Sequence, residues 1–445
     1  MNQPPDLETL KRDAARGIPG ASYNLGVWYL QARGEARDPE AAKAAFETAA
    51  AAGFAPAMSA LGYVYLRGQG VDYDAPRAAD WFTRAADQGF PEARYRLGEM
   101  RAAGYGLDQD LAAARADFET AAGLDHTPAM CQLAYCLAEG LGGDADPAGA
   151  TEYYGRAAVA GDPRAQCAIG DRYERGDTLP EDPAQAMAWY QRAQGRGYRG
   201  AELAAARLEP NLTGAQRERA QALAAHPRPA VDVATPAAAR PRRPSVVTLS
   251  WSPRAFLYRD LLSPEECFHL IALSGAFLRP ALVLNRETGE RSVESARRAH
   301  TARLMDPLRD LVVGNLEKRV AEHVLLPPEN AEPFTIIRYG PGDEYRPHAD
   351  YYDPDDPGSR TGLDQGGQRL ATFLAYLNRP PEGGETSFPR IGLSVPPEPG
   401  AGLLFFNCAP DGTPDPATLH AGNPVGAGEK WLASRWIRVG RFRPA

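Results

Sequence analysis

Two histidines and one aspartate near the C-terminal end of the chain have the types and spacing of metal ligands. His348 and Asp350 are two positions apart, so both side chains point to the same face if the segment is a strand. His420 follows further along the chain and can bring a second imidazole to the same ion. Two imidazoles and one carboxylate bind a metal on one face and leave its other coordination positions open.

A lysine shortly after the second histidine adds a cation to this set. Non-heme Fe(II) oxygenases use two histidines and one carboxylate, and bind a co-substrate and dioxygen at the open positions. Lys430 lies ten residues past His420 and would bind the carboxylate of an organic acid. Taken alone, His348 and Asp350 are more typical of a surface histidine beside a loop carboxylate. Together with His420 and Lys430 they indicate an iron site.

The surrounding sequence predicts the elements that must position these groups. A helix is expected to begin at Pro264, with Ser263 as its N-cap, and a second helix is expected over residues 308–323. Strand-like runs separated by turns rich in glycine and proline follow at residues 334–339, 370–378, 402–407 and 430–439. Short strands after helices predict a jelly-roll barrel with supporting helices.

The last of these strands would carry the lysine into the barrel. Side chains alternate along a strand, so Lys430, Ser434 and Trp436 would share the inward face. Thr372 and Tyr376 share a face of the strand over 370–378 in the same way. A lysine buried in a barrel is costly unless it is paired. We therefore expect its partner to be a carboxylate of the co-substrate.

Five motifs in the C-terminal half, in a fixed order, resemble a known enzyme family. They lie at residues 339–350, 366–377, 383–389, 410–420 and 428–431. With these motifs, residues 250–440 resemble the catalytic domain of the prolyl 4-hydroxylase family of 2-oxoglutarate- and Fe(II)-dependent dioxygenases. A histidine-x-aspartate pair alone is a weak signal, but the five motifs in this order are specific.

The resemblance implies a role for each matching position. It implies Fe(II), 2-oxoglutarate and dioxygen as cofactor and co-substrates, and it leaves a requirement for L-ascorbate open. The implied catalytic residues are the metal ligands and the residue that binds the distal carboxylate of 2-oxoglutarate: His348, Asp350, His420 and Lys430. The positions implied to surround the co-substrate are Tyr339, Thr372, Tyr376 and Trp436. The positions implied to face the peptide substrate are Arg298, Glu332 and Arg369.

Two positions depart from the family pattern. The family usually has an arginine–threonine–serine loop over the substrate, whereas here Arg298 is followed by Ala299 and His300. Arg438 stands where some relatives have a histidine close to the substrate. Both changes leave the residues for iron and 2-oxoglutarate in place, but they leave open whether the substrate is a proline-rich peptide.

The N-terminal half repeats with a period of 36 residues. A small residue opens each unit at Ala21, Ala57, Ala93, Ala129, Ala165 and Ala201, and an aromatic residue recurs at Phe46, Phe82, Phe118, Tyr154 and Tyr190. A period of this length predicts stacked helix pairs. The pattern resembles Sel-one-like repeats of the tetratricopeptide superfamily, with five full units and a half unit before them. This resemblance implies an all-α solenoid that presents a concave surface to a protein partner.

Composition sets the domain organisation and excludes some classes of protein. The chain has 445 residues, so several domains are expected. We predict an α-solenoid over residues 1–225, a linker rich in proline, alanine and arginine over 226–245, and the dioxygenase domain over 246–445. The formal net charge of −8 argues against a nucleic-acid partner, which would require a basic face.

The same composition gives expectations about location. The sequence has no apolar run long enough for a membrane span, and its first residues have no apolar core, so we expect no membrane association and no secretory signal. Five cysteines without CxxC spacing predict reduced thiols in a cytoplasmic protein.

Three functions remain open on the sequence. The first is a hydroxylase for a prolyl residue in a peptide or protein that the repeats recruit. The second is the same oxygenase chemistry on another side chain, a free amino acid or a small metabolite. The third is a repeat-based adaptor or oxygen sensor with slow catalysis. The intact ligand set with Lys430 favours the two catalytic functions.

Overall fold

The structure is a computed structural model that describes residues 6–226, 230–231, 238–239, 244–284, 290–294, 296–305, 309–409 and 412–443. The chain divides into two compact units, Met1–Asp162 and Pro163–Ala445, and each is described by itself. Within the described ranges, no helix has the length and apolar character needed to cross a membrane.

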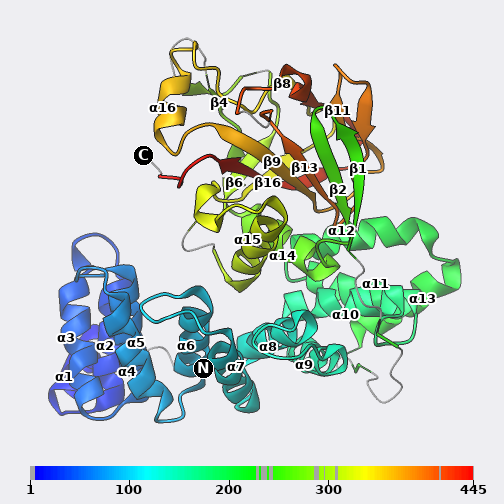
Figure 1. The fold of residues 1–445 in the computed structure, drawn as a ribbon. Helices are drawn as coiled ribbons and strands as arrows, with labels where there is room; N and C mark the ends of the chain where they lie inside the picture. Colours follow the sequence, from blue (N-terminus) through cyan, green and yellow to red (C-terminus); the bar gives the residue numbers. More distant parts are fainter. Residues whose placement is uncertain are drawn as a thin grey trace. The chain divides into compact units, whose positions relative to one another are not determined.

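The N-terminal unit consists of paired antiparallel helices (Figure 1). They are α1 (Leu7–Ala15), α2 (Pro19–Gln31), α3 (Pro39–Ala51), α4 (Ala55–Arg67), α5 (Ala75–Ala86), α6 (Pro91–Ala103), α7 (Leu111–Gly123), α8 (Thr127–Glu139) and α9 (Pro147–Val159). The repeat prediction is confirmed, because each 36-residue unit forms one helix pair.

The repeating residues have identifiable structural tasks. The second helix of each pair begins after an aspartate whose side chain accepts a hydrogen bond from the first turn, as at Asp38 and Asp74. Glycine and aromatic positions recur together because they touch. A Cβ atom on Gly62 would lie only 2.7 Å from the ring of Phe82, so an alanine there would force the pair of helices apart.

The C-terminal unit begins with the last helix pair and its capping helices. These are α10 (Pro163–Arg175), α11 (Pro183–Gln194), α12 (Arg199–Leu208) and α13 (Gly214–Ala225). Three more helices follow among the strands: α14 (Pro264–Gly275), α15 (Leu311–Val324) and α16 (Ser359–Asp364). Ser263 caps α14 as expected, with Pro264 at its first position.

The strands described in this unit form one large sheet, one small sheet and two separate strand pairs, all antiparallel. The large sheet has the order β1 (Ser245–Trp251), β2 (Arg254–Arg259), β13 (Gly402–Phe406), β9 (Arg369–Tyr376), β16 (Lys430–Arg438), β7 (Thr335–Tyr339), β6 (His300–Arg303) and β3 (Arg279–Pro280). The small sheet has the order β12 (Leu393–Val395), β11 (Thr386–Phe388), β14 (His420–Gly422) and β8 (Tyr345–His348). Two further pairs are β10 (Glu382–Gly383) with β15 (Val425–Ala427), and β4 (Val283–Leu284) with β5 (Arg291–Ser292).

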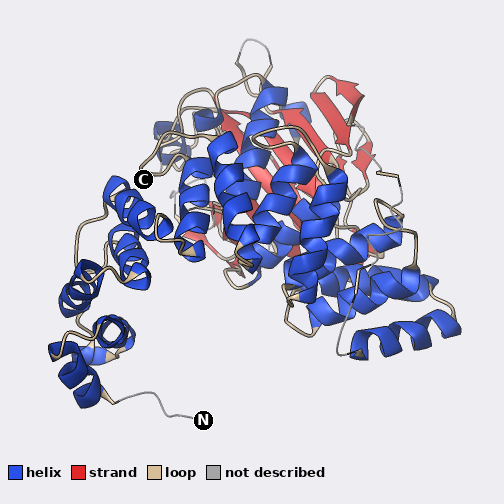
Figure 2. Ribbon diagram, turned by 90° about the horizontal axis from the view of Figure 1, so that it is seen from below, coloured by secondary structure: helices blue, strands red, loops and turns tan. Residues whose placement is uncertain are grey.

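Alternation along the strands separates two hydrophobic cores. One face of the large sheet packs on α14 and α15 through residues such as Phe373, Trp431 and Ile437, and Figure 2 shows helices covering this sheet. The other face contributes Leu374 and Leu432 to the core between the sheets. The predicted double-stranded β-helix (jelly-roll) barrel with supporting helices is confirmed.

The last repeat packs directly on the barrel's supporting helix. Helix α12 approaches α14 so closely that a Cβ atom on Gly200 would lie 2.8 Å from Phe268. Arg172 of α10 forms an ion pair with Glu265 of α14. The compact division therefore falls ahead of Pro163, whereas the boundaries expected at 225 and 245 stay a prediction. Most of the expected linker over 226–245 lies outside the described residues.

Candidate active site

The three expected metal ligands meet where two strands of the small sheet pair. His348 of β8 is the register partner of His420 of β14, and Asp350 follows shortly after β8. Nε2 of His348 lies 3.7 Å from one carboxylate oxygen of Asp350, and Nε2 of His420 lies 3.5 Å from the other. One donor atom from each residue lies within 4.8 Å of the others. The structure thus brings the three donors around one point.

Backbone carbonyls hold both imidazole rings. Nδ1 of His348 lies 2.9 Å from the carbonyl oxygen of Arg346, and Nδ1 of His420 lies 3.0 Å from that of Thr418. A carbonyl oxygen only accepts hydrogen bonds, so Nδ1 carries the proton and Nε2 keeps its lone pair. Tyr345 stacks on His348 with ring centroids 3.5 Å apart. Both rings therefore present Nε2 to a metal.

Thr372 supports the carboxylate ligand. Its hydroxyl donates to Oδ2 of Asp350 at 2.7 Å and accepts from Nδ2 of Asn407 at 3.0 Å. The resemblance implied that Thr372 lines the 2-oxoglutarate pocket, but it is fully buried and lies behind Asp350, outside the lining of both cavities at the site. Its hydroxyl orients the carboxylate of Asp350, the candidate metal ligand.

His348 and Asp350 have the charge states that a divalent metal needs. Burial lowers the pKa of His348 to about 3, and His420 adds to this effect. Burial acts to raise the pKa of Asp350, but the neighbouring His420 and His348 outweigh it and the pKa falls to about 2. At neutral pH His348 is neutral and Asp350 is charged, which are the forms that bind metal. This donor set fits Fe(II).

A small pocket of about 40 Å³ beside the ligands contains the expected lysine. Lys430 is 1% exposed and lies opposite Tyr339 in the register of β16 and β7. Its Nζ lies 5.6 Å from the ring centroid of Tyr339 and 5.7 Å from that of Tyr376. Within the described part of the chain, Lys430 makes no ion pair. A carboxylate of the co-substrate would complete one.

One further residue of this pocket was not singled out from the sequence. Thr386 of β11 lines the pocket, and its hydroxyl lies 2.9 Å from that of Tyr376. This contact places Tyr376 behind Thr386, so Tyr376 itself does not line the cavity. Thr386 lies inside the motif at residues 383–389, and this motif is the sequence signal that could have identified it.

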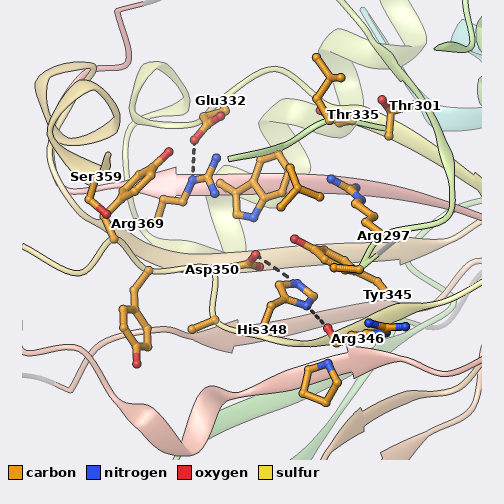
Figure 3. Close-up of a pocket in the computed structure, with 18 of the residues that line it drawn as sticks. Arg297, Thr301, Glu332, Thr335, Tyr345, Arg346, His348, Asp350, Ser359 and Arg369 are labelled. Carbon is orange, nitrogen blue, oxygen red and sulfur yellow. Dashed lines mark hydrogen bonds and ion pairs between the residues drawn. The ribbon is translucent and has the colours of Figure 1, made fainter. Parts of the chain in front are cut away.

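A larger cleft of about 390 Å³ opens beside the ligands (Figure 3). It shares His348, Asp350 and Trp436 with the Lys430 pocket. Glu332 and Arg369 also lie on its wall, where Nε of Arg369 donates to Glu332 at 2.7 Å. The Arg369 guanidinium lies 4.1 Å from the ring centroid of Trp436. The cleft therefore lies next to the candidate metal ligands and the Lys430 pocket.

Arg438, which differs from the residue that some relatives have at this position, has a structural role. Arg438 is fully buried and donates to Glu332 at 2.7 Å and to the carbonyl oxygen of Gly362 at 2.6 Å. It does not line the cleft. Arg438 therefore holds Glu332 and the segment around Gly362 in place, and its presence does not bear on the substrate directly.

The structure places Arg298 away from the cleft and its neighbour Arg297 in it. Arg298 is exposed and donates to the carbonyl oxygen of Gly342 at 2.5 Å. Arg297 lines both cavities, with its guanidinium 4.8 Å from the ring centroid of Tyr345. On β6, Thr301 lines the cleft and His300 does not. The sequence offered no signal to separate the two adjacent arginines.

Comparisons with known proteins identify the families to which both halves of the chain are similar. A family model described as the 2OG-Fe(II) oxygenase superfamily matches residues 334–438, and a Sel1 repeat model matches five successive stretches between residues 19 and 193. "Probable prolyl 4-hydroxylase 7" of Arabidopsis thaliana is 39% identical over 218 residues, which cover 45% of this chain and 67% of that relative. "Probable prolyl 4-hydroxylase 3" of the same plant is 37% identical over 214 residues, covering 44% and 72%.

The chain belongs to the prolyl 4-hydroxylase family. It is a 2-oxoglutarate-dependent dioxygenase, and the family implies Fe(II), 2-oxoglutarate and dioxygen. A crystal structure of a viral collagen prolyl hydroxylase from Paramecium Bursaria Chlorella virus-1, in complex with 2-oxoglutarate, is 29% identical; it covers 41% of this chain and 94% of that chain, with a TM-score of 0.33. Besides the oxygenase domain, this member of the family carries Sel1 repeats.

A shared carboxylate connects helix α12, which caps the repeats, to the Lys430 strand. Glu429 precedes Lys430 and lies 2.8 Å from Arg199 of α12 and 2.5 Å from Arg338 of β7. It also accepts from the indole of Trp431 at 2.9 Å. Burial opposes the charged form of Glu429, but the hydrogen bonds from Arg338 and Arg199 lower its pKa to about 2. A helix of the repeat array thus helps to hold the turn that carries Lys430.

Replacing Arg199 with alanine is expected to weaken 2-oxoglutarate binding. The ion pair is partly exposed, so its loss should raise the KM for 2-oxoglutarate by about two- to fivefold and change kcat less. Steady-state succinate formation measures both constants. Arg217→Ala, which removes an exposed ion pair with Glu209 in the same helical region, is the control. An unchanged KM in the Arg199 variant would refute the connection.

The affinity for 2-oxoglutarate is expected to fall as the pH rises above about 7. Burial lowers the pKa of Lys430 to about 7, and Glu385 offsets this only in part. Only the charged ammonium attracts the co-substrate carboxylate, so above this pKa a proton must be taken up on binding. The dissociation constant should then rise by up to about tenfold per pH unit, and below the pKa it should stay level.

Calorimetric titration of the Mn(II)-loaded protein with 2-oxoglutarate over a series of pH values measures this dependence without turnover. Lys430→Arg is the matched variant, because a guanidinium stays charged over the whole range. The variant should show a flatter pH dependence than the wild type. A wild-type affinity that does not change on the alkaline side would contradict the expectation.

Proposed function

We propose that this protein hydroxylates a prolyl residue within a peptide or protein chain. The observation that carries the proposal is the open cleft of about 390 Å³ that shares His348, Asp350 and Trp436 with the Lys430 pocket. The wall of the cleft includes residues of β3 and β8, the edge strands of the two sheets, so an extended segment of a longer chain can lie between them. The names of the relatives, prolyl 4-hydroxylases, support proline as the target.

The residues of the site have distinct tasks in this reaction. When bound at His348, Asp350 and His420, Fe(II) with 2-oxoglutarate and dioxygen supplies the oxidation that converts a C–H bond to C–OH, releasing succinate and carbon dioxide. Thr372 orients the carboxylate ligand, and Lys430 binds the far end of 2-oxoglutarate. Trp436 forms the wall between pocket and cleft and excludes water from the co-substrate side.

The repeats supply the second part of the proposal. Sel1 repeats are protein-interaction modules, and we propose that the array recruits the protein whose proline enters the cleft. The five cysteines are buried thiols that are not joined in disulfides, which supports the proposed location in the reducing cytoplasm. A requirement for L-ascorbate belongs to the same proposal and is tested by leaving ascorbate out of the assay.

Peptide mass spectrometry tests the proposed function. The full-length protein is incubated with Fe(II), 2-oxoglutarate and a set of proline-containing peptides, and succinate is measured in parallel. The expected result is the gain of one oxygen atom, located on a proline by fragmentation. A library in which each proline is replaced by alanine is the matched control.

Two outcomes would overturn this proposal in different ways. Oxygen located on another side chain would favour the alternative of a non-prolyl substrate. Succinate formed at the same slow rate with every peptide, without any mass gain, would favour an adaptor or oxygen sensor whose catalysis is not directed at a peptide.

A further inference from the structure

The wall of the cleft is rich in arginine although the chain is acidic. The arginines that line it are Arg279, Arg297, Arg303, Arg346 and Arg369, and the carboxylates that line it are Glu332 and Asp350. The formal net charge of the whole chain is −8. The cleft therefore has the opposite charge balance from the protein around it. A generally basic composition cannot explain the arginines of the cleft, because the chain as a whole is acidic.

Neither carboxylate on the wall is available to a substrate. Asp350 is a metal ligand. Glu332 is 2% exposed and is held by Arg369 and by the buried Arg438, each at 2.7 Å. Burial opposes the charge on Glu332, and the arginines around it, Arg369 first, lower its pKa below the usual range. Glu332 therefore balances charge on Arg369, Arg438 and Arg303, and its carboxylate does not reach Arg279, Arg297 or Arg346.

The rim arginines stand on the edges of both sheets. Arg279 is exposed on β3, the edge strand of the large sheet, opposite Thr301. Arg346 is on β8, the edge strand of the small sheet, with its side chain 60% exposed and 3.7 Å from Glu344. Among the described residues, Arg279 and Arg297 make no ion pair. A segment lying in the cleft would thus meet cationic groups from both sides.

Hydrogen-bond donors inside the cleft lack acceptors. The hydroxyl of Thr335, the indole N–H of Trp436 and Nε of Arg297 are buried and have no hydrogen-bond partner among the residues that the structure describes. Thr335 is 6% exposed. Buried polar groups are nearly always bonded, because each one left without a partner is destabilising. Three such groups on one wall indicate that the ligand brings acceptors to them.

We propose that the target proline lies in an acidic segment, with aspartate or glutamate close to it in sequence. The carboxylates would pair with Arg279 and Arg346 at the rim, while backbone carbonyls of the segment accept from Thr335 and Trp436. Arg297, which lies between the rim and the ligands, pairs with a carboxylate next to the target. This inference rests on the proposed function and specifies its substrate class.

Matched peptides test the charge preference. Three peptides share one proline-containing sequence and differ only in the residues that flank the proline, which are glutamate, glutamine or lysine. Glutamine keeps the shape of glutamate without its charge. We expect kcat/KM for the glutamate peptide to exceed that for the glutamine peptide by about tenfold, with the lysine peptide lower still. The preference should shrink as salt is added.

Arginine variants connect the preference to the cleft. Arg279→Gln and Arg346→Gln should each lower kcat/KM for the glutamate peptide several-fold and leave the glutamine peptide nearly unchanged. Arg259→Gln is the control. Arg259 is also an exposed arginine, lies on β2 next to an edge strand and pairs with Glu398, but it does not line the cleft. Thermal unfolding of each variant verifies that the fold is intact.

Binding measurements separate this inference from the proposed function. Fluorescence anisotropy of the same labelled peptides with Mn(II)-loaded protein reports binding without turnover. Equal binding and equal hydroxylation of the three peptides would overturn the acidic-segment inference and leave prolyl hydroxylation standing. Preferred binding of the glutamate peptide without oxygen on proline would overturn prolyl hydroxylation and support the charge preference. A preference that survives both arginine substitutions would overturn the assignment to the cleft.

Discussion

Replacing Asp350 with asparagine is expected to reduce 2-oxoglutarate turnover by more than about a hundredfold, because even residues that only support a metal ligand typically contribute 10- to 100-fold. Asparagine keeps the shape of aspartate and can still accept from Thr372, but it removes the negative charge between His348 and His420. Alanine at His348 or His420 should have an effect of the same size. The measurements are iron affinity by competition titration and succinate formation at saturating Fe(II).

Thr372→Val is the graded comparison. It leaves all three ligands in place and removes only the hydroxyl that donates to Asp350 at 2.7 Å. Turnover of 2-oxoglutarate should therefore fall by about 10- to 100-fold. Wild-type turnover by the Asp350→Asn variant with added Fe(II) would show that the reaction does not depend on this ligand set, and the site would have to be reassigned.

The second large effect is expected from replacing Lys430 with methionine. The lysine is 1% exposed and would form a buried ion pair with the co-substrate. Breaking such a pair costs about 3–5 kcal/mol, so the KM for 2-oxoglutarate should rise by at least about a hundredfold, since each 1.4 kcal/mol is tenfold. Kinetics at varied 2-oxoglutarate concentration measure the change.

The same substitution should have the opposite effect on the protein without co-substrate. Burial lowers the pKa of Lys430, so the charged form destabilises the empty fold at pH values below about 7, where the lysine is protonated. Lys430→Met should therefore unfold at the same or a higher temperature than the wild type at acidic pH, and 2-oxoglutarate should no longer raise that temperature. Lys318→Met, at an exposed position of α15, is the control. A large loss of stability in the Lys430 variant would contradict this explanation.

Features set by local spacing could be predicted from the sequence. The 36-residue period predicted the helix pairs because each glycine, such as Gly62, faces the aromatic ring of its own unit, such as Phe82. The alternation along β16 predicted that Lys430 and Trp436 share one face, and both line the Lys430 pocket; Trp431, on the opposite face, packs in the core under the helices. The order of motifs predicted which histidines meet at Asp350.

Features that depend on contacts between distant segments could not be predicted. The hydroxyl of Thr372 is on the expected face of β9, but its bond to Asp350 depends on where the loop after β8 returns. Arg297 and Arg298 precede β6, where no alternation assigns one of them to the cleft. The pairing of Arg199 with Glu429 joins residues far apart in the chain, and neither has a spacing that signals the other.

The position of Arg199 bears on how such a chain can be rearranged by recombination or by design. Repeats ahead of Pro163 form their own compact unit and could be gained, lost or exchanged without disturbing the turn at Glu429. The last repeat and its cap could not, because α12 contributes Arg199 to that turn and Gly200 to the contact with Phe268. In a chimaera, the junction that preserves the enzyme is therefore the start of the fifth repeat, and not the proline-rich segment that the sequence offers as the natural place to cut.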